Sequence, residues 1–261
     1  MGSNKAPHSP IILGNTDTGL LKLLALIFMI IDHSGKMLFP FIPEMRLIGR
    51  IAFPLYGWCL VVGSEYTRDI WRYAFRIAVV GLIAQPFYML GLNHTWLEPN
   101  IFLTLLLALL GIIAIKEQKY YSQIWGPVLA VILGAALGPD YGWRGVFFVL
   151  MLYGARKSRS GLLVAFLSFA FFWGGSGSPV TQVFGWRLPI FNIPYVSDIA
   201  TPFFRTQALA WMALPLILFS TNTHFKLPKW LGYSAYPLHL AILAIIVHFD
   251  EITVWFAGLF A

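Results

Sequence analysis

Residues 27–58 read IFMIIDHSGKMLFPFIPEMRLIGRIAFPLYGW. Asp32 and His33 close an almost wholly apolar run, and Arg50 opens the next one after a short turn. Ionisable side chains at membrane depth are costly, so those that occur there usually belong to a functional site. The stretch therefore predicts two membrane spans that meet at a polar cluster, and we interpret the rest of the chain as the scaffold around that cluster.

The overall composition indicates a membrane protein. Of the 261 residues, 58% are hydrophobic and 11% are charged, whereas soluble domains carry roughly 25% charged residues. We therefore expect an all-α, polytopic transmembrane helix bundle. The net charge of +7 comes from Lys and Arg residues scattered between apolar runs. This pattern favours contact with membrane lipid and argues against nucleic acid as a partner.

Apolar windows of helical length predict about nine spans. They lie near residues 19–40, 46–64, 70–91, 100–116, 122–138, 143–155, 160–173, 206–221 and 231–249. The sixth and seventh are shorter than the roughly 20 residues that cross a bilayer, so we expect them to be tilted, broken or re-entrant. Residues 1–18 are interpreted as a polar amino-terminal tail and residues 19–261 as one integral-membrane domain. The first span is expected to be retained, because no small-residue cleavage site follows it.

The distribution of Lys and Arg predicts the topology. With nine spans, the amino terminus and the second, fourth, sixth and eighth connectors share one side of the membrane, and most basic residues collect there. Such residues mark the cytoplasmic side. We therefore expect a cytoplasmic amino terminus and an external carboxyl terminus.

The polar cluster can be placed by depth. Asp32 lies about 18 Å along a helix that starts at Leu20, beyond the middle of a core roughly 30 Å thick. Arg50 lies one turn from Arg46, at the outer edge of the second span, so Arg50 can meet Asp32. His33 could then act as a general base, with Asp32 fixing its tautomer. The alternative is an Asp-Arg pair that only locks two helices together, with His33 facing a backbone carbonyl.

A basic stripe begins the third span, where Arg68, Arg72 and Arg76 recur every four residues on one helix face. The stripe could hold the phosphates of a ligand. Alternatively it sets topology, with Arg68 paired to Glu65 and Arg72 to Asp69. For Arg76, which lies a turn deeper without an obvious acidic partner, we favour the functional interpretation.

Two further residues have two interpretations each. His239, in the last span, is either a hydrogen-bonded structural residue or part of the site. Asn100 is either the cap of the fourth span or a donor to a reacting carbonyl. Residues 140–142, Asp-Tyr-Gly, are typical of a tight turn. Zinc-type His-Glu-x-x-His and paired-cysteine motifs are absent from the sequence, so we expect no metal.

Short motifs in a fixed order resemble the TraX family over residues 19–246. They are Asp32-His33, Gly49-Arg50, Ala52-Phe53-Pro54, Glu65-Tyr66-Thr67-Arg68, Asn100-Ile101, Gly138-Pro139, Tyr141-Gly142, Tyr236 and His239-Leu240. The family comprises membrane proteins of F-like conjugation systems that N-acetylate the pilin subunit. The resemblance implies an acetyltransferase of the bacterial inner membrane, with cytoplasmic acetyl-CoA as donor and the amino terminus of processed conjugative pilin as acceptor.

The residue patterns and the resemblance together predict roles for individual residues. On this interpretation His33, Asp32, Arg50 and Asn100 are catalytic, Arg72 and Arg76 of the basic stripe bind the acyl donor, and so do His239 and Tyr236. We expect a funnel that opens to the cytoplasm and narrows towards His33 between the first, second, third and last spans, with His239 on its wall. Two other classes remain open: an O-acyltransferase that acts on a surface glycan, and a transporter or other non-catalytic membrane partner of the conjugation machinery. A transporter is expected to show inverted repeats, and the sequence has none.

Overall fold

The computed structural model describes residues 12–173 and 178–249. The first part of the chain is entirely helical. Its elements are α1 (Thr18–Met37), α2 (Pro43–Gly49), α3 (Ala52–Tyr66), α4 (Ile70–Leu92), α5 (Ile101–Glu117), the 3-10 helix η1 (Lys119–Tyr121), α6 (Ser122–Leu137), α7 (Gly142–Ala155) and α8 (Arg159–Trp173).

The second part combines short elements with one long helix. They are β1 (Gln182–Val183), β2 (Trp186–Arg187), η2 (Pro189–Asn192), α9 (Val196–Ala200), η3 (Ala208–Ala213), α10 (Leu214–Leu218) and α11 (Lys229–Val247). The expected all-α class therefore needs one small correction. β1 and β2 form an antiparallel hairpin, closed by Phe184 and Gly185, which both have positive φ as a tight two-residue hairpin turn requires.

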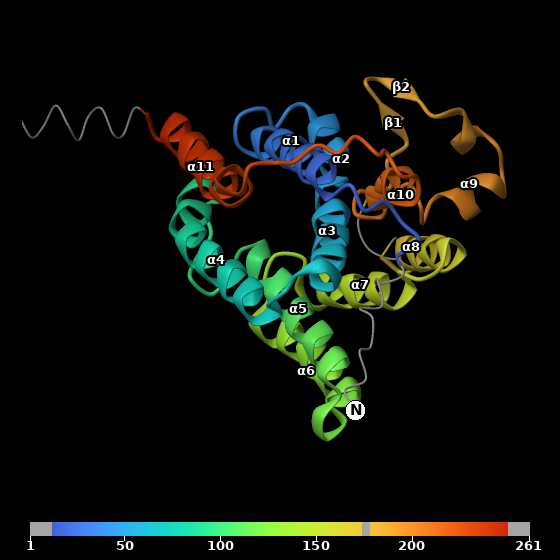
Figure 1. The fold of residues 1–261 in the computed structure, drawn as a ribbon. Coiled ribbons are helices and arrows are strands. Elements are labelled where there is room, and N and C mark those ends of the chain that lie inside the picture. Colours follow the sequence, from blue (N-terminus) through green and yellow to red (C-terminus); the bar gives the residue numbers. More distant parts are fainter. Residues whose placement is uncertain (1–11, 174–177, 250–261) are drawn as a thin grey trace, which may run out of the picture.

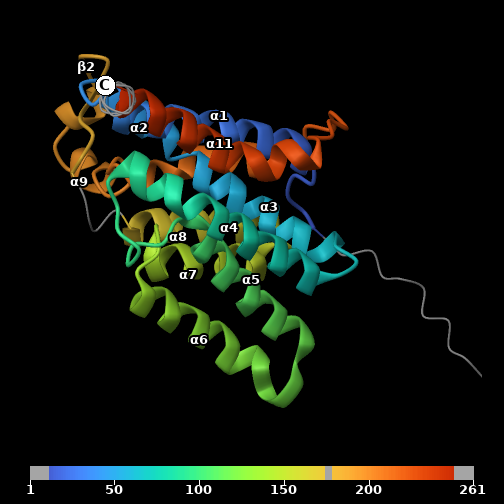
Figure 2. The same ribbon diagram turned by 90° about the vertical axis from the view of Figure 1, so that its left-hand side faces the viewer.

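Five helices form a closed ring in the order α1, α3, α5, α4, α11, in which each helix packs against the next and α11 packs against α1. Figure 2 shows α1, α3, α4 and α11 lying alongside one another. Outside the ring, α6 and α7 pack on α5, and α8 packs on α7. α11 thus returns from the far end of the sequence to close the ring between α1 and α4.

Five segments are long and apolar enough to cross a membrane within the described part of the chain. They are Thr18–Met37, Pro43–Tyr66, Ile70–Leu92, Lys119–Leu137 and Trp230–Val247. Shorter apolar helices cover Gly142–Ala155, Arg159–Trp173 and Ala208–Leu218. The chain is therefore a membrane protein built mainly of helices, and the nine-span count and the orientation stay predictions.

Two predicted spans are interrupted in the structure. The second contains a break between α2 and α3, at Arg50 and Ile51. The eighth, residues 206–221, consists of the 3-10 helix η3 followed by the five-residue α10. Pro215 lies in the first turn of α10, where its missing N–H leaves no hydrogen bond unmade. Hydropathy alone does not register such breaks, because the residues on both sides are apolar.

The segment before α1 belongs to the fold, which corrects part of the expected polar tail. Asn15 has none of its surface exposed. Its Nδ2 donates to Leu216 O at 2.9 Å, and its carbonyl accepts from Trp58 Nε1 at 2.7 Å. Asp17 then caps α1 by accepting from Leu20 N. Residues 12–17 therefore join α1, α3 and α10, while residues 1–11 lie outside the described part.

Candidate functional site

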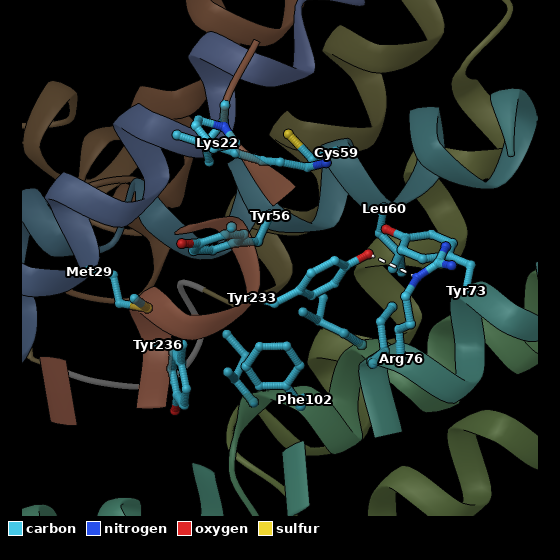
Figure 3. A pocket seen from close by; sticks show the side chains of 16 residues that line it. Lys22, Met29, Tyr56, Cys59, Leu60, Tyr73, Arg76, Phe102, Tyr233 and Tyr236 are labelled. Atoms are coloured by element: carbon cyan, nitrogen blue, oxygen red, sulfur yellow. Dashed lines mark hydrogen bonds between the residues drawn. The ribbon is translucent and has the colours of Figure 1, made fainter. Parts of the chain in front are cut away.

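The helical ring encloses a cavity of about 300 Å³, near the ends at which α1, α4 and α11 begin. All five ring helices line it, and two of its lining residues are cations, Lys22 and Arg76. Arg76 Nε donates to Tyr233 Oη at 3.1 Å across the cavity, as Figure 3 shows, with Tyr236 on the side of Met29. We call this the first cavity.

A second cavity of about 160 Å³ adjoins the first towards the end of α1. Both cavities share four lining residues, Met29, Tyr56, Ile101 and Tyr236. The second cavity is much more polar than the first. Its charged and titratable side chains other than tyrosines are Asp32, His33, Lys36, Arg46, Arg50, His94 and Asp140. The two cavities lie between the four spans predicted for the funnel, and α5 also contributes to their wall. His239, which was expected on this wall, lines neither cavity. The opening of the funnel to the cytoplasm stays a prediction.

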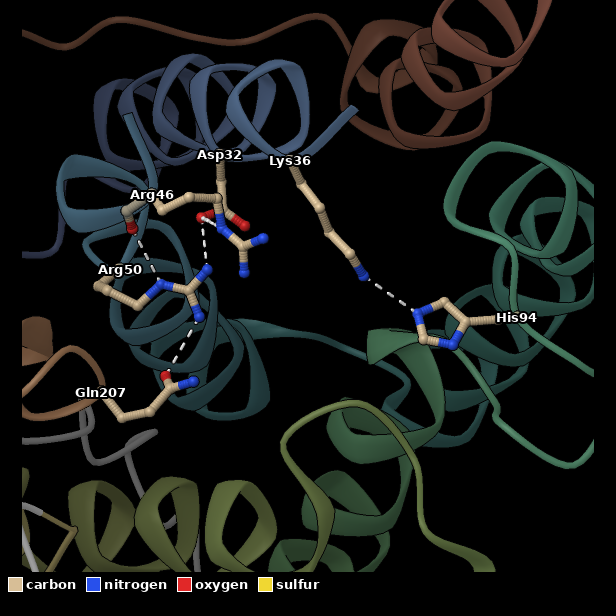
Figure 4. Close-up of polar contacts among 6 residues, drawn as sticks. All are labelled: Asp32, Lys36, Arg46, Arg50, His94 and Gln207. Carbon is tan, nitrogen blue, oxygen red and sulfur yellow. Dashed lines mark hydrogen bonds and ion pairs between the residues drawn. The ribbon is translucent and has the colours of Figure 1, made fainter. Parts of the chain in front are cut away.

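The predicted meeting of Asp32 and Arg50 is confirmed. Arg50 Nη2 donates to Asp32 Oδ1, and Arg46 Nε lies 3.2 Å from the same oxygen. Arg50 also donates through Nη1 to Gln207 Oε1 at 3.1 Å and through Nε to Arg46 O at 3.1 Å. Figure 4 shows these side chains converging from α1, α2 and the segment before η3. Arg50 is only 6% exposed, so the network holds it in one position.

Gly49 explains how Asp32 and Arg50 come so close. A Cβ atom added at Gly49 would lie 2.3 Å from Asp32 Cβ, a distance that real side chains do not reach. Because Gly49 has no side chain, α2 can pack directly on α1 and carry Arg50 to the carboxylate. The Gly49-Arg50 motif therefore has a steric reason.

His33 is paired with His239, and not with Asp32 as predicted. His33 Nδ1 lies 2.7 Å from His239 Nε2, and the two rings are stacked with 8° between their planes. Successive residues of an α-helix point about 100° apart, so Asp32 faces α2 while His33 faces α11. Sequence analysis missed this pairing because 206 positions separate the two residues.

The hydrogen bonds of the pair fix its tautomers. His239 Nδ1 lies 3.0 Å from Ala235 O, and because a carbonyl can only accept, Nδ1 must carry the proton. A neutral His239 then accepts at Nε2, and His33 donates from Nδ1. His33 Nε2 is left unprotonated, with no hydrogen bond to any described residue. Since His33 lines the second cavity, the pair presents a free imidazole nitrogen at the site.

Tyr236 lies one turn before His239 on α11 and is 5% exposed. Its ring packs edge-on against His33, His239 and Phe102, with centroid distances of 6.2, 5.3 and 5.0 Å. Its hydroxyl is buried and has no hydrogen-bond partner among the described residues. Tyr236 thus stands beside the histidine pair, where the two cavities adjoin.

Asn100 has the capping role that was one of its two interpretations. Its Oδ1 accepts from Phe102 N at 2.9 Å at the start of α5. Both amide hydrogens are also used, because Nδ2 donates to Gly81 O at 2.8 Å and to Gln85 Oε1 at 2.9 Å. With its acceptor and donors engaged, Asn100 joins α4 to α5, and we give it no part in the chemistry proposed below.

The basic stripe divides. Arg76 lines the first cavity, whereas Arg72 is 83% exposed and pairs with Asp69 Oδ2 at 3.0 Å, as the topology interpretation predicted. Arg72 lines neither cavity, so the structure does not bring it to the site with Arg76. The predicted partner of Arg68 is wrong: Glu65 lies between Lys116 and Arg156, at 3.5 and 3.6 Å.

Sequence analysis did not assign Lys36, His94 or Asp140 to the site, although all three line the second cavity. Lys36 Nζ lies 3.3 Å from His94 Nε2, and Lys36 follows Asp32 by one helical turn, a spacing that could have identified it. Asp140 is half-buried in the turn before α7 and forms no ion pair with a described residue. Burial raises the pKa of its carboxyl above the ordinary value, against the opposing charge of Arg50.

Metal ligation gains no support from the described part of the chain, where no group of three or more His, Cys, Asp or Glu side chains could hold an ion. The candidate site combines a free imidazole nitrogen, an unpartnered phenol, and an arginine held by a carboxylate.

Comparison with known proteins places this geometry in context. A family model described as "TraX protein" matches residues 17–247. A "Probable fimbrial assembly protein FimC, serogroup H1" of Dichelobacter nodosus is 29% identical over 164 residues, which are 56% of this chain and 66% of that protein. An uncharacterized protein of Rickettsia prowazekii (strain Madrid E) is 39% identical over 88 residues, 34% of this chain and 33% of its own. The chain thus spans less than two thirds of either relative. No solved structure matches.

Proposed function

Because the chain belongs to the TraX family, we propose that it is a membrane-embedded acetyltransferase of a pilus system, which moves an acetyl group from cytoplasmic acetyl-CoA to the amino-terminal amine of processed conjugative pilin. The family supplies the donor, the acceptor and the inner-membrane location. The fimbrial assembly protein of Dichelobacter nodosus, whose name concerns a related surface filament, supports the pilus context.

The observation that carries the proposal is the position of the His33–His239 pair. The free Nε2 belongs to His33, which lines the polar second cavity. The first cavity adjoins the second and carries the cations Lys22 and Arg76. From Lys22 to His33 the first helix advances about 16 Å. Acetyl-CoA is a long molecule with phosphates at one end and a thioester at the other end, and such a molecule suits two adjoining cavities of this kind.

The charges suggest how the donor lies. Lys22 and Arg76 in the first cavity suit the phosphates of CoA. In the orientation expected from the basic connectors, this end faces the cytoplasm, where acetyl-CoA is found. The pantetheine arm then runs past Tyr56 and Tyr236, and the thioester reaches His33. The acceptor enters through the second cavity from the outer side.

Each proton in the reaction has a place. The neutral amine of the acceptor attacks the thioester carbon, and His33 Nε2 takes the amine proton. The tetrahedral intermediate collapses, the C–S bond breaks, and the electron pair leaves on the CoA sulfur. His33 then returns its proton to the thiolate, which gives the amide and CoA thiol. His239 accepts from His33 Nδ1 throughout and keeps the imidazole oriented.

Arg50 supports this site without needing to move. Its bonds to Asp32, Gln207 and the Arg46 carbonyl fix a positive charge in the second cavity, where negative charge develops on the thioester oxygen. Asp32 balances that charge and holds α1 against α2. In this role Asp32 positions Arg50 and does not orient His33.

The test uses the full-length protein in lipid nanodiscs, acetyl-CoA labelled in its acetyl group, and mature pilin. We expect label on the pilin amino terminus by mass spectrometry, and none with His33→Ala protein of equal Tm. A purified surface polysaccharide serves as the competing acceptor. Labelling of the polysaccharide alone contradicts the pilin assignment, and pilin acetylated normally by the His33→Ala variant contradicts the catalytic one.

A further inference from the structure

Tyr236 carries an unused hydrogen-bond donor at the centre of the site. Tyr236 is only 5% exposed, and its hydroxyl has no hydrogen-bond partner among the described residues. Buried hydroxyls are normally hydrogen-bonded, because an unsatisfied one costs stability. A fold that keeps such a group beside a reactive histidine points to an acceptor that arrives with a ligand.

The surroundings of Tyr236 hold its ring in place. His33, His239 and Phe102 contact it edge-on, and each comes from a different helix, α1, α11 and α5. Tyr236 is also one of the four residues that line both cavities. A ligand that runs from the first cavity to His33 must therefore pass this residue.

Asn100 and Arg50, two other donors near the site, are held by the fold. Asn100 uses both amide hydrogens within the fold, and Arg50 makes three hydrogen bonds in the polar network. Tyr233, one turn earlier on α11, accepts from Arg76 and lines only the first cavity. Tyr236 differs from these residues because its hydroxyl is buried without a partner among the described residues and its ring packs against His33.

We propose that Tyr236 is a catalytic residue whose hydroxyl donates a hydrogen bond to the thioester oxygen of the acyl donor and to the oxyanion that forms from it. The proposal rests on the proposed function and deepens it. When the amine nitrogen bonds to the carbonyl carbon, the π pair of the C=O moves onto oxygen, and Tyr236 Oη–H stabilises the negative charge. When the C=O reforms and the C–S bond breaks, the sulfur takes the electron pair, and Tyr236 keeps its proton throughout.

The first experiment measures kinetics with Tyr236→Phe, which removes only the hydroxyl. We expect kcat to fall by about 10²–10³-fold, the loss typical of one oxyanion donor, with little change in the KM for acetyl-CoA. Tm should stay the same or rise, because the hydroxyl makes no bond in the resting protein. Tyr195→Phe is the control, because Tyr195 is exposed and lines neither cavity, and we expect its kcat and KM to equal those of the wild type.

The second experiment does not depend on acetyl transfer. Acetonyl-dethio-CoA is a ketone in which a methylene replaces the thioester sulfur, so that it cannot give up its acetyl group. With its carbonyl labelled by ¹³C, we expect the C=O stretch to shift to lower frequency on binding to the wild-type protein and to Tyr195→Phe. The shift should be lost in Tyr236→Phe at equal occupancy.

These readouts separate the two ideas. A wild-type kcat in Tyr236→Phe, or the same carbonyl frequency with and without the hydroxyl, overturns the role of Tyr236 even if pilin is acetylated. If the wild-type protein transfers acetyl to no pilin, the proposed function fails. In that case a carbonyl shift that requires Tyr236 still supports the inference.

Discussion

His33 Nδ1 and His239 Nε2 lie 2.7 Å apart in rings that stack with 8° between their planes. The contact links α1 to α11, where these two helices close the ring. The contact also couples the tautomers of the two rings. The Ala235 carbonyl keeps the proton of His239 on Nδ1, so His239 Nε2 accepts from His33 Nδ1 and His33 Nε2 stays free. His239 thereby acts on the chemistry through His33.

The first prediction concerns His239. In His239→Ala, His33 loses its acceptor and its preferred tautomer, so we expect kcat to fall by about 10²-fold, within the range for general-base catalysis. His239→Gln offers an amide oxygen as acceptor and should retain more activity than His239→Ala. Acetyl transfer to pilin measures both variants, with His248→Ala at the end of the same helix as control. Equal activity of His239→Ala and the wild type would contradict the pairing as a functional one.

A second prediction concerns the contact between α1 and α2. In Gly49→Ala the new Cβ meets Asp32 Cβ at 2.3 Å, so α2 must move away and the Asp32–Arg50 pair must loosen. We expect a loss of about 1–3 kcal/mol in the free energy of unfolding, as for other overpacked sites, together with reduced acetyl transfer.

Gly154→Ala is the matched control for Gly49→Ala. A Cβ atom at Gly154 has no neighbour within 4 Å, and alanine favours a helix by up to about 1 kcal/mol over glycine. This variant should be as stable as the wild type or slightly more so. Denaturant unfolding in a fixed detergent measures both variants, and similar losses for the two would rule out the close approach as the cause.

The part of the site that sequence reasoning predicted depends on neighbouring spans. Asp32 and Arg50 belong to consecutive apolar runs, so their depths could be compared by helical rise alone, and their meeting is confirmed. The short turn between these runs leaves few ways to arrange them. The pairing of Asp32 with Arg50 therefore follows from the lengths of the two apolar runs and from the opposite charges of the two side chains.

The other contacts depend on the order of helices in the ring. His239 reaches His33, and Gln207 reaches Arg50, only because the end of the chain returns beside α1 and α2. Hydropathy reports that a segment is apolar but not which helix it packs against. The same limit explains why the eighth predicted span proved to be two short helices broken near Pro215.

A third prediction uses two aspartates outside the spans whose pKa values shift in opposite directions. Burial is the largest single influence on Asp17 and acts to raise its pKa, but hydrogen bonds from Thr223, Thr221 and Leu20 together outweigh it and hold the pKa below the ordinary value. Asp17 therefore contributes stability above its unfolded pKa, and this contribution is lost as pH falls through the folded pKa. Asp17→Ala should lower Tm at pH 7, with a loss that shrinks towards pH 3.

Asp140 should behave in the opposite way. Burial raises the pKa of its carboxyl, so the fold favours the neutral form, and the benefit present below the unfolded pKa is lost as pH rises through the folded pKa. Asp140→Asn should keep its backbone contacts to Pro99 and Thr104 and raise Tm at pH 7. Thermal unfolding at several pH values measures both variants, and parallel pH profiles for the two would contradict the assigned environments.

The fourth prediction concerns the acyl donor and Arg76. If the first cavity holds the phosphates of CoA, Arg76→Gln removes one charge-assisted contact, typically about 1.5–3 kcal/mol, and should weaken acetyl-CoA binding by at least about tenfold. The wild-type affinity should fall with added salt, and the variant's affinity should fall less. Calorimetry on the detergent-purified protein measures both, with the exposed Arg72→Gln as control, because Arg72 pairs with Asp69 and lines neither cavity.

Dephospho-CoA and Lys22 complete the test of the first cavity. Dephospho-CoA has one phosphate fewer, so it should distinguish the wild type from Arg76→Gln less sharply than CoA does. Lys22→Gln should weaken CoA binding as well, because Lys22 lines the same cavity from α1. If Arg72→Gln weakens binding as much as Arg76→Gln, the effect comes from the general positive charge at this end of the bundle. If neither Arg76→Gln nor Lys22→Gln changes the affinity, the phosphates lie outside the first cavity, and Arg76 is left with its hydrogen bond to Tyr233 and a role in topology.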